Sequence, residues 1–351
     1  MRLLNRYIFN SVAGTTALVL VVLLSLSGFM SFIGQLGDVG EGDFTMFHAV
    51  NYALLKLPGM AAGLMPVSAL LGSLLGLGAM AASSELIVMR SAGISINRLA
   101  RSVAMTGLAL ALFGGVIGEF IAPQMDLYAR QMKAVAKSGG ADITGSDAWL
   151  RSGDTIVNVR SSIDGTDYGG VYTYRFVMPG QLAGIGRGES VEYENGWQLQ
   201  NFRESLLGDE AVTIGTQFDR KKLEKLRDLL AITEVKESSL TGQELRSYID
   251  YLESNGLDAD RYVIAFWNRI SSMAGIIVMC VLALPFVTGS LRSAGAGARI
   301  VIGALIGVGY FLLSRTLTDS VTVFNLSPVF VAWLPTLILA AVAWAGMQRI
   351  R

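Results

Sequence analysis

SSELIVMRSAGIS, residues 83–95, separates two long apolar segments and combines a helix start, one acid, one base and a glycine stop. Ser83 or Ser84 is expected to cap the helix start. Glu85 falls in the first turn, where the positive end of the helix dipole stabilises a carboxylate. Gly93 is expected to end the helix, because glycine readily adopts the left-handed conformation of a C-terminal cap. The stretch is therefore predicted to be a short helix.

The apolar face of this helix is formed by Leu86 and Met89, with Ile87 beside them. A short amphipathic helix between two membrane segments has two interpretations. It is either an ordinary interfacial connector, or a coupling helix through which a membrane subunit receives movement from a cytoplasmic motor. The pattern alone favours neither interpretation.

The chain has the composition of a membrane protein. Of its 351 residues, 52% are hydrophobic and only 16% are charged, whereas soluble domains average about 25% charged residues. The formal net charge is zero, which gives no overall basis for nucleic-acid binding. Cys280 and His48 are the only cysteine and histidine, so disulfides, zinc sites and triad chemistry are poorly supported. No Walker-type phosphate loop occurs, so the chain is expected to bind no nucleotide or other cofactor itself.

Six apolar runs are long enough to cross a bilayer, which takes about 20 residues. The first run exceeds the roughly 7–15-residue core of a signal peptide, and no small-residue cleavage site follows it, so it is predicted to be an uncleaved span. The predicted spans are residues 12–33, 57–82, 99–122, 270–287, 300–323 and 329–347.

The polar region after the third span changes from a helical to a strand-like pattern. Residues 125–137 are expected to extend the third span as a helix, and the runs TIVNV and GVYTYRFV, rich in β-branched and aromatic residues, then predict short strands. The Asn-Gly pair in YENGW, residues 193–197, favours a type I′ hairpin. Further turns are expected at residues 164–165, 169–170 and 179–180.

After the strands, the charged run 219–228 is expected to be solvated, and residues 240–262 to be helical, capped by Thr241 and broken at Gly256. The predicted fold is an α-helical membrane protein with six transmembrane helices (3+3) and an inserted all-β domain, sandwich- or jelly-roll-like. The expected units are residues 1–137 with the short helix at 84–95, residues 138–236 with the strands, and residues 237–351 with a helical connector and the last three spans.

Basic residues lie in alternate loops, all on one side of the predicted spans. The other short loops carry Asp38, Glu41 and Asp43 and almost no arginine. By the positive-inside rule, both termini and residues 83–95 are predicted to be cytoplasmic and the β domain to lie outside. The arginines of the cytoplasmic side are Arg2, Arg6, Arg90, Arg98, Arg101, Arg292, Arg299, Arg349 and Arg351.

Glycines recur at helical spacing within the spans. Such small-xxx-small pairs support a closely packed bundle or a dimer, although glycine is common in membrane helices in any case. The pairs are Gly59/Gly63, Gly72/Gly76, Gly114/Gly118 and Gly303/Gly307.

Charges at membrane depth indicate a polar site. Arg315 lies in the fifth span with Asp319 one turn later, and Glu119 lies near the outer end of the third. A charge at the bilayer centre costs at least ~2.5–3.5 kcal/mol, so such residues usually face a cavity or a partner. Either the i, i+4 pair neutralises itself, or Arg315 belongs to a cationic wall for an anionic substrate. Three basic residues just outside the third span would extend that wall, or form a solvated helix face: Arg130, Lys133 and Lys137.

Several motifs together resemble a known family. Besides SSELIVMRSAGIS, they are SLSGFMSFIGQL in the first span, PVSALLGSLLGLGAMAASSEL in the second, GEFIAP at the end of the third and LRSAGAGAR after the fourth. With the three-plus-three layout and the outside β domain, they resemble the LptF/LptG permeases over nearly the whole chain. These are subunits of the ABC transporter that extracts lipopolysaccharide from the inner membrane of Gram-negative bacteria. The first span and SELIVM are more similar to LptG than to LptF.

The resemblance implies a transport subunit without enzymatic activity, whose partners are an LptF-like permease, two LptB ATPases and the bridge protein LptC. ATP and Mg²⁺ would be bound by LptB in the cytoplasm. The β domain would be a periplasmic jelly roll that contacts LptF and LptC. The ATPase-coupling residues implied are Glu85, Leu86, Met89 and Arg90.

The substrate-binding residues that the resemblance implies are Arg130, Lys133, Arg315 and Ser31. The first three would meet the phosphates of lipopolysaccharide. Ser31 and Asp38 stand near the end of the first span, where some relatives carry lysines. Arg315 would compensate for the charge missing there.

A membrane-anchored periplasmic scaffold or binding protein, without transport activity, is the alternative from another class. It accounts for the β domain but not for Arg315 or the coupling-like helix. An ion-coupled secondary transporter would need helices broken at corresponding positions of the two halves, and a membrane peptidase would need paired catalytic side chains. The sequence supplies neither.

Overall fold

The structure is a computed structural model. It describes residues 2–137, 148–152, 155–159, 171–178, 181–188, 190–193, 197–200, 203–207, 212–216, 237–289, 295–324 and 326–349. The predicted turns at residues 164–165, 169–170 and 179–180, the charged run 219–228 and Arg292 lie outside these residues.

Within the described residues, six helices are long and apolar enough to cross a membrane, as the sequence predicted. α2 begins well before residue 57, because His48, Asn51 and Lys56 break the apolar pattern without breaking the helix. The backbone N–H of Thr45, just before the helix, donates to Nδ1 of His48 at 3.2 Å. The helices are α1 (Arg2–Gln35), α2 (Met46–Ala82), α4 (Ile96–Val116), α8 (Asp260–Thr288), α9 (Ala296–Phe324) and α10 (Pro328–Arg349).

The third long helix continues beyond the predicted span. α4 passes through a π-helical segment, η2 (Ile117–Ile121), into α5 (Ala122–Lys137). The sequence predicted this extension, but not the π-helical segment. Such segments are rare and often lie at functional sites, and this one carries Glu119.

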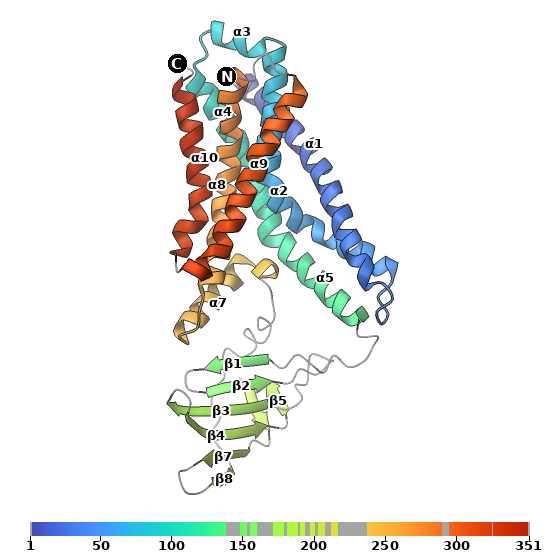
Figure 1. Ribbon diagram of the computed structural model, residues 1–351, viewed down its shortest axis with the longest axis vertical. Coiled ribbons are helices and arrows are strands. Elements are labelled where there is room, and N and C mark those ends of the chain that lie inside the picture. The colour runs from blue at the N-terminus through green and yellow to red at the C-terminus, as the bar shows by residue number, and fades with distance from the viewer. Residues whose placement is uncertain are drawn as a thin grey trace.

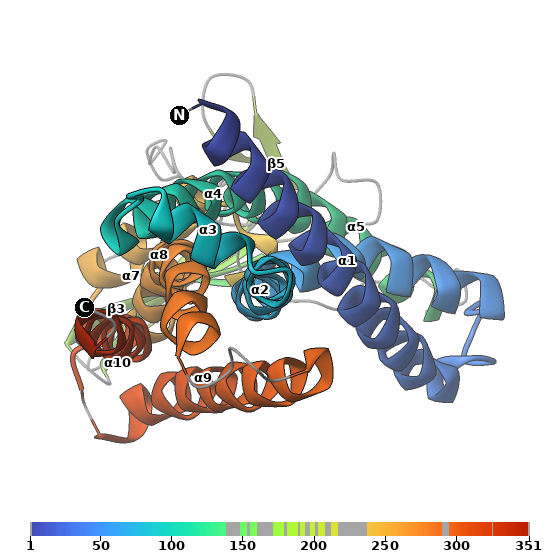
Figure 2. The same ribbon diagram turned by 90° about the horizontal axis from the view of Figure 1, so that it is seen from above.

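α2 lies at the centre of the bundle. It packs against α1, α4, α8 and α9. In the most apolar 18-residue stretch of α2, 67% of the residues are buried, compared with 6% in that of α1. Figure 2 shows α1 and α9 on different sides of α2, at the periphery. Their outer faces carry large exposed apolar side chains, including Leu18, Val22, Leu305 and Leu312. These faces are suited to contact lipid or a second membrane subunit.

The glycine pairs serve helix packing unequally. A Cβ on Gly72 would overlap the backbone of Thr16, and one on Gly76 would lie 3.0 Å from the carbonyl oxygen of Ser11. Thr15 also donates to the carbonyl of Gly72 at 2.7 Å. α1 and α2 therefore touch backbone to backbone at the Gly72/Gly76 pair, as such pairs allow. Gly63, by contrast, has nothing within 4 Å of an added Cβ.

The strands form an antiparallel sheet with the order β1-β2-β3-β4-β7-β8 and a separate hairpin of β5 and β6. TIVNV forms β2, and GVYTYRFV contributes most of β3, as predicted. The strands are β1 (Ala148–Ser152), β2 (Thr155–Val159), β3 (Val171–Met178), β4 (Gln181–Gly188), β5 (Ser190–Tyr193), β6 (Trp197–Gln200), β7 (Arg203–Leu207) and β8 (Val212–Thr216).

The predicted hairpin at residues 193–197 is present, whereas its turn, residues 194–196, lies outside the described residues. Tyr193 pairs with Trp197, which leaves residues 194–196 between the strands. The sequence thus located the point at which the chain reverses direction between β5 and β6.

A helical connector leads from the sheet region back to the bundle. It contains η3 (Glu237–Ser239) and α7 (Gly242–Ser254). Thr241 caps α7 as predicted, in a reciprocal capping box with Glu244. Gly256, at φ +66°, separates α7 from α8 as predicted. Burial raises the pKa of Tyr248 to about 12, with a further contribution from Tyr262.

The two ends of the molecule differ in character. Both termini lie at one end of the helix bundle, beside the short helix α3 (Glu85–Ser91), whereas the sheet lies beyond the other end (Figure 1). α5 and η3 are the described elements on either side of the strands in the sequence. The helix bundle therefore separates α3 from the sheet.

Candidate functional site

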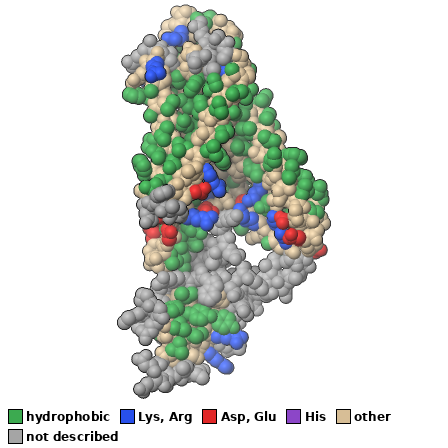
Figure 3. Space-filling view, viewed as in Figure 1, with side chains coloured by type: hydrophobic (Ala, Val, Ile, Leu, Met, Phe, Trp, Pro, Cys, Tyr) green, Lys and Arg blue, Asp and Glu red, His purple; other side chains and the backbone are tan. Residues whose placement is uncertain are grey.

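A polar cavity of about 750 Å³ lies between α8 and α9, with α2 and α10 also contributing to its wall. The polar side chains on α9 fall at i, i+4, i+5, i+8 and i+9 and so share one face of that helix. Charged side chains gather at this end of the bundle, near the sheet (Figure 3). The polar residues lining the cavity are Glu237, Arg261, Asn268, Ser271, Ser272, Tyr310, Ser314, Arg315, Thr318 and Asp319.

Arg315 is, with Arg261, one of two exposed cations that line this cavity. Its Nε atom lies 3.3 Å from Oδ2 of Asp319, so the predicted i, i+4 pair forms. The two side chains are 72% and 65% exposed, and exposed pairs of this kind are worth only about 0–1 kcal/mol. The pair therefore offers little resistance to an anion that approaches Arg315. The predicted pair therefore forms, while a role for Arg315 towards an anionic substrate stays a prediction.

Lys133 and Lys137, by contrast, are neither a solvated helix face nor free cations. Lys133 Nζ lies 2.5 Å from Oδ2 of Asp38, and Lys137 Nζ lies 2.9 Å from its Oδ1. Lys137 also contacts Oε2 of Glu41 at 2.6 Å. Both lysines of α5 are thus paired with carboxylates of the loop between α1 and α2, a pairing that sequence spacing did not indicate.

Arg130 belongs to a second cluster, centred on Asp126. The Asp126 side chain is buried and accepts hydrogen bonds from Arg130 Nε at 2.8 Å, from Lys56 and from Ser239. Sequence reasoning missed Lys56 and Asp126. A lysine within an otherwise apolar helix and an aspartate four residues before Arg130 were the available signals.

A third polar cluster joins the π-helical segment to the connector. Glu119 accepts hydrogen bonds from the backbone N–H of Gly242 and from Nη1 of Arg269, the latter at 3.2 Å. Arg269 Nη2 donates at 2.7 Å to the carbonyl oxygens of both Glu237 and Leu240. The carboxylate at membrane depth is therefore neutralised within the chain, and it holds the segment that returns from the strands.

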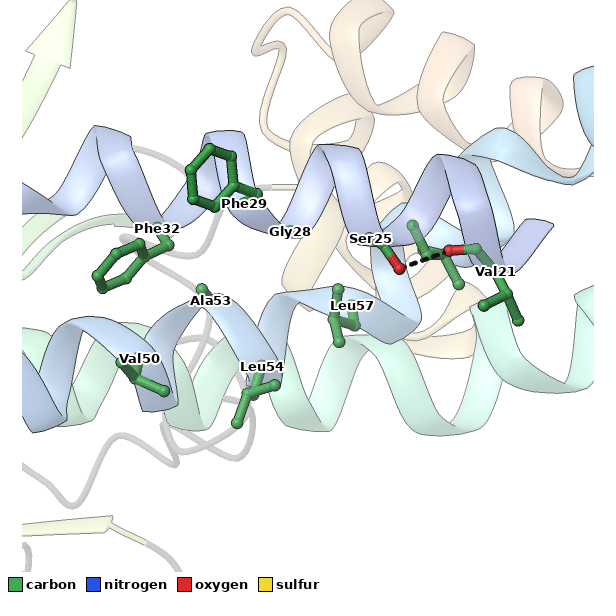
Figure 4. Close-up of a pocket in the computed structure, with 10 residues that line it drawn as sticks. Val21, Ser25, Gly28, Phe29, Phe32, Val50, Ala53, Leu54 and Leu57 are labelled. Carbon is green, nitrogen blue, oxygen red and sulfur yellow. Dashed lines mark hydrogen bonds between the residues drawn. The ribbon is translucent and has the colours of Figure 1, made fainter. Parts of the chain in front are cut away.

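A separate groove of about 450 Å³ lies between α1 and α2, and its lining is almost wholly apolar (Figure 4). Ser25 is its polar exception, and its hydroxyl is used within α1, where it donates to the carbonyl of Val21 at 2.8 Å. Ser31 is half-buried on α1 but lines neither this groove nor the polar cavity. The structure thus does not bring Ser31 and Arg315 into one cavity.

The short helix α3 is shorter than the predicted residues 84–95. The serine cap is a correction, because Ser84 adopts φ +63° and its side chain makes no capping hydrogen bond. Ser83 instead donates to Oε1 of Glu85 at 2.8 Å. Glu85 Oε2 accepts from the hydroxyl of Tyr7 in α1, also at 2.8 Å. Gly93, at φ +86°, follows the helix end as predicted.

The residues of α3 predicted to couple to an ATPase divide between its two faces. Leu86 is 4% exposed and belongs to the main core of the bundle, and the partly buried Met89 packs against that core. Ile87 and Val88 are 42% and 64% exposed, so Ile87 does not belong to the buried face. Arg90 is also exposed. Ile87, Val88 and Arg90 thus form the exposed side of α3, whereas Leu86 and Met89 pack inward on the bundle.

These features define a polytopic membrane protein with a polar cavity at one end of its bundle and a short helix at the other. The family model of the lipopolysaccharide export system permease LptF/LptG matches residues 6–349, so the chain belongs to this family. It is a multi-pass membrane protein with six apolar helices.

The chain is similar to curated members of both branches of the family. It is 32% identical over 353 residues to the lipopolysaccharide export system permease protein LptG of Haemophilus influenzae, covering 99% of each chain. It is 32% identical over 339 residues to LptG of Escherichia coli strain K12, covering 95% of this chain and 94% of the relative. Identity to LptF of the same strain is 23% over 351 residues, with 96% and 92% covered. LptF is thus the more distant branch, as the sequence motifs predicted.

Proposed function

We propose that this chain is the LptG-type permease subunit of an ABC transporter that extracts lipopolysaccharide from the outer leaflet of the inner membrane. The single observation that carries the proposal is the family match over residues 6–349. The greater identity to LptG than to LptF supports the assignment of the branch. The chain acts as a transport subunit and not as an enzyme, and a partner ATPase hydrolyses ATP.

The proposed topology places three spans before the strands and three after them. Both termini and α3 are cytoplasmic, which agrees with the arginines in alternate loops. Residues 138–236 form a periplasmic domain, and its antiparallel strands are part of a jelly roll. Residues 1–137 and 237–351 together form the membrane unit. The positions of the termini and the sheet at opposite ends of the bundle support this orientation (Figure 1).

The proposed complex contains an LptF-like permease, two LptB ATPases that bind ATP and Mg²⁺, and the bridge protein LptC. The exposed apolar faces of α1 and α9 are suited to the permease partner and to lipid. The exposed edge of α3, with Glu85 at its start, is the proposed LptB contact.

The proposed transport step begins when ATP binding closes the LptB pair and moves α3. Leu86 belongs to the same core cluster as residues of α2, α4 and α8, and Met89 packs against that cluster, so the movement spreads through the bundle. The cavity beside Arg315 then narrows and the lipid moves towards the β domain. Arg315 holds lipid phosphate by charge, whereas the apolar spans accommodate acyl chains. The non-transporting scaffold receives no support from the family match.

Coupling to the ATPase tests the proposal. Glu85→Ala is expected to reduce copurification of LptB and ATP-driven lipopolysaccharide transfer, because the variant loses the carboxylate that Ser83 and Tyr7 orient. Glu253→Ala, a change at an exposed carboxylate of α7, is the matched control and should leave both readouts at wild-type values. Wild-type LptB yield together with intact transfer in Glu85→Ala would contradict the coupling assignment.

A further inference from the structure

The loop between α1 and α2 occupies the donors of Lys133. The Lys133 ammonium donates to Oε1 of Gln35 and contacts Oδ2 of Asp38, both at 2.5 Å. It also lies 5.2 Å from the ring centroid of Tyr52 and 5.9 Å from that of Phe44. A lysine has three N–H donors, and two of those of Lys133 have partners here, Gln35 and Asp38. An incoming anion therefore competes with Asp38 and Gln35 for the Lys133 ammonium.

Lys137 is held by the same loop, through contacts that are open to exchange. Its partners are Asp38 and Glu41, at 2.9 and 2.6 Å. The side chains of Lys137 and Glu41 are 33% and 55% exposed. Water and salt screen such partly exposed pairs, which keeps their net strength small. A second anion can consequently replace the carboxylates at modest cost.

The loop is anchored on α5 independently of its carboxylates. Phe44 is 1% exposed and packs in one cluster with Ala49 and Ala136. The backbone N–H of Asp43 donates to the carbonyl of Ala136 at 2.7 Å. The backbone can therefore stay in place while the side chains of Asp38 and Glu41 leave the lysines.

We propose that Asp38 and Glu41 are intramolecular counter-ions that set the charge requirement for lipid at Lys133 and Lys137. The inference rests on the proposed function and adds a specificity mechanism to it. The loop carboxylates compete with the lipid anion, so the site selects phosphate monoesters over phosphodiesters.

The selectivity follows from charge. A phosphate monoester carries about −1.5 to −2 charges near pH 7, more than the single charge of each carboxylate that it replaces. A phosphodiester headgroup carries one negative charge and gains nothing by the exchange. Specificity is a difference between affinities, and a built-in competitor lowers the affinity for the wrong ligand. Ordinary phospholipids would thus be excluded from lysines that a monoester-bearing lipid can reach.

The test uses the full complex in phosphatidylcholine nanodiscs, with a photo-crosslinking residue at the exposed Leu36 of the loop. Nanodiscs contain either labelled phosphatidic acid, a monoester, or labelled phosphatidylglycerol, a diester. The wild-type complex should crosslink phosphatidic acid preferentially. Asp38→Asn/Glu41→Gln should raise the phosphatidylglycerol yield by up to about fivefold per carboxylate, the upper range for partly exposed ion pairs. The yield with phosphatidic acid should rise less, so the preference falls.

Asp43→Asn is the matched control. This substitution removes one negative charge from the same loop, but Asp43 contacts α5 through its backbone N–H, which the substitution keeps. An unchanged preference in the double variant, or an equal shift in Asp43→Asn, would overturn the proposal. Glu41→Gln alone, at the more exposed carboxylate, should fold and show a smaller shift in the same direction. If the wild-type complex crosslinks neither phosphatidic acid nor lipopolysaccharide from position 36, this inference fails. The proposed function survives that result if the wild-type complex transfers lipopolysaccharide and the Glu85→Ala variant transfers less.

Discussion

The side chain of Asp126 joins three parts of the chain that are distant in sequence. It lies on α5, accepts hydrogen bonds from Lys56 of α2, and accepts two more from Ser238 and Ser239 of η3. Only its contact with Arg130, one turn away, is local. Sequence spacing can suggest an i, i+4 pair, but it cannot supply partners that come from other elements. For this reason the sequence identified Arg130 as a cation of interest and missed the carboxylate that holds it.

Asp126→Asn is expected to destabilise the bundle. The variant keeps the shape of the side chain but leaves Lys56 and Arg130 without a counter-charge. Breaking a buried pair costs about 3–5 kcal/mol, and the partial exposure of both cations places this case near the lower end. Thermal unfolding of the purified complex in detergent measures the loss as a lower Tm. Asp319→Asn, at an exposed pair, should leave Tm nearly unchanged, and equal Tm values for the two variants would contradict the prediction.

At the scale of the element, the sequence predicted helix ends better than it predicted which helix surfaces pack together. Thr241, Gly93 and Gly256 were located from the sequence because caps and helix ends depend on neighbouring backbone. The cap at Ser84 was wrong, since the chain turns there through a left-handed residue to reorient α3 after α2. The glycine pairs were predicted to allow close packing, but which pair meets a backbone depends on how the helices are oriented.

Gly72→Ala is expected to separate α1 from α2. The added methyl would overlap the backbone of Thr16, and overpacking of this kind typically costs about 1–3 kcal/mol. Gly63→Ala is the matched control in the same helix, because its methyl meets nothing within 4 Å and alanine favours a helix over glycine. Tm of the purified complex should fall for Gly72→Ala and stay level or rise for Gly63→Ala. A similar Tm for both variants would show that the α1–α2 contact is not tight in the membrane.

At the scale of the molecule, the apolar runs predicted the six long helices, because a membrane span is recognisable from the length and hydropathy of its own residues. The order of the strands was not predictable in the same way. β4 pairs with β7 and not with β5, the next strand in the sequence, because β5 and β6 form a separate hairpin. Such pairing depends on long-range packing. The sequence also gave no sign that Glu119 and Asp126 would hold the return segment, since their partners follow only after the strands.

Arg269 is the residue through which the bundle is expected to move the β domain. It holds the carbonyls of Glu237 and Leu240 and the carboxylate of Glu119, and so fixes the return segment on two spans. Arg269→Gln should leave ATP hydrolysis near its wild-type rate, since α3 lies at the other end of the molecule. Transfer of lipopolysaccharide per ATP should fall by about two- to thirtyfold, the effect of losing ~0.5–2 kcal/mol of coupling.

Arg261→Gln provides the control for this prediction. Arg261 lies on the same helix and also contacts Glu237, but it meets the carboxylate and is 66% exposed. Its loss should change the transfer per ATP little, because the return segment keeps its backbone contacts with Arg269. ATPase activity and lipid transfer measured on the same preparation separate coupling from general damage. Equal losses of both activities in Arg269→Gln would assign the residue to stability, and equal transfer by the two variants would remove the return segment from the path of movement.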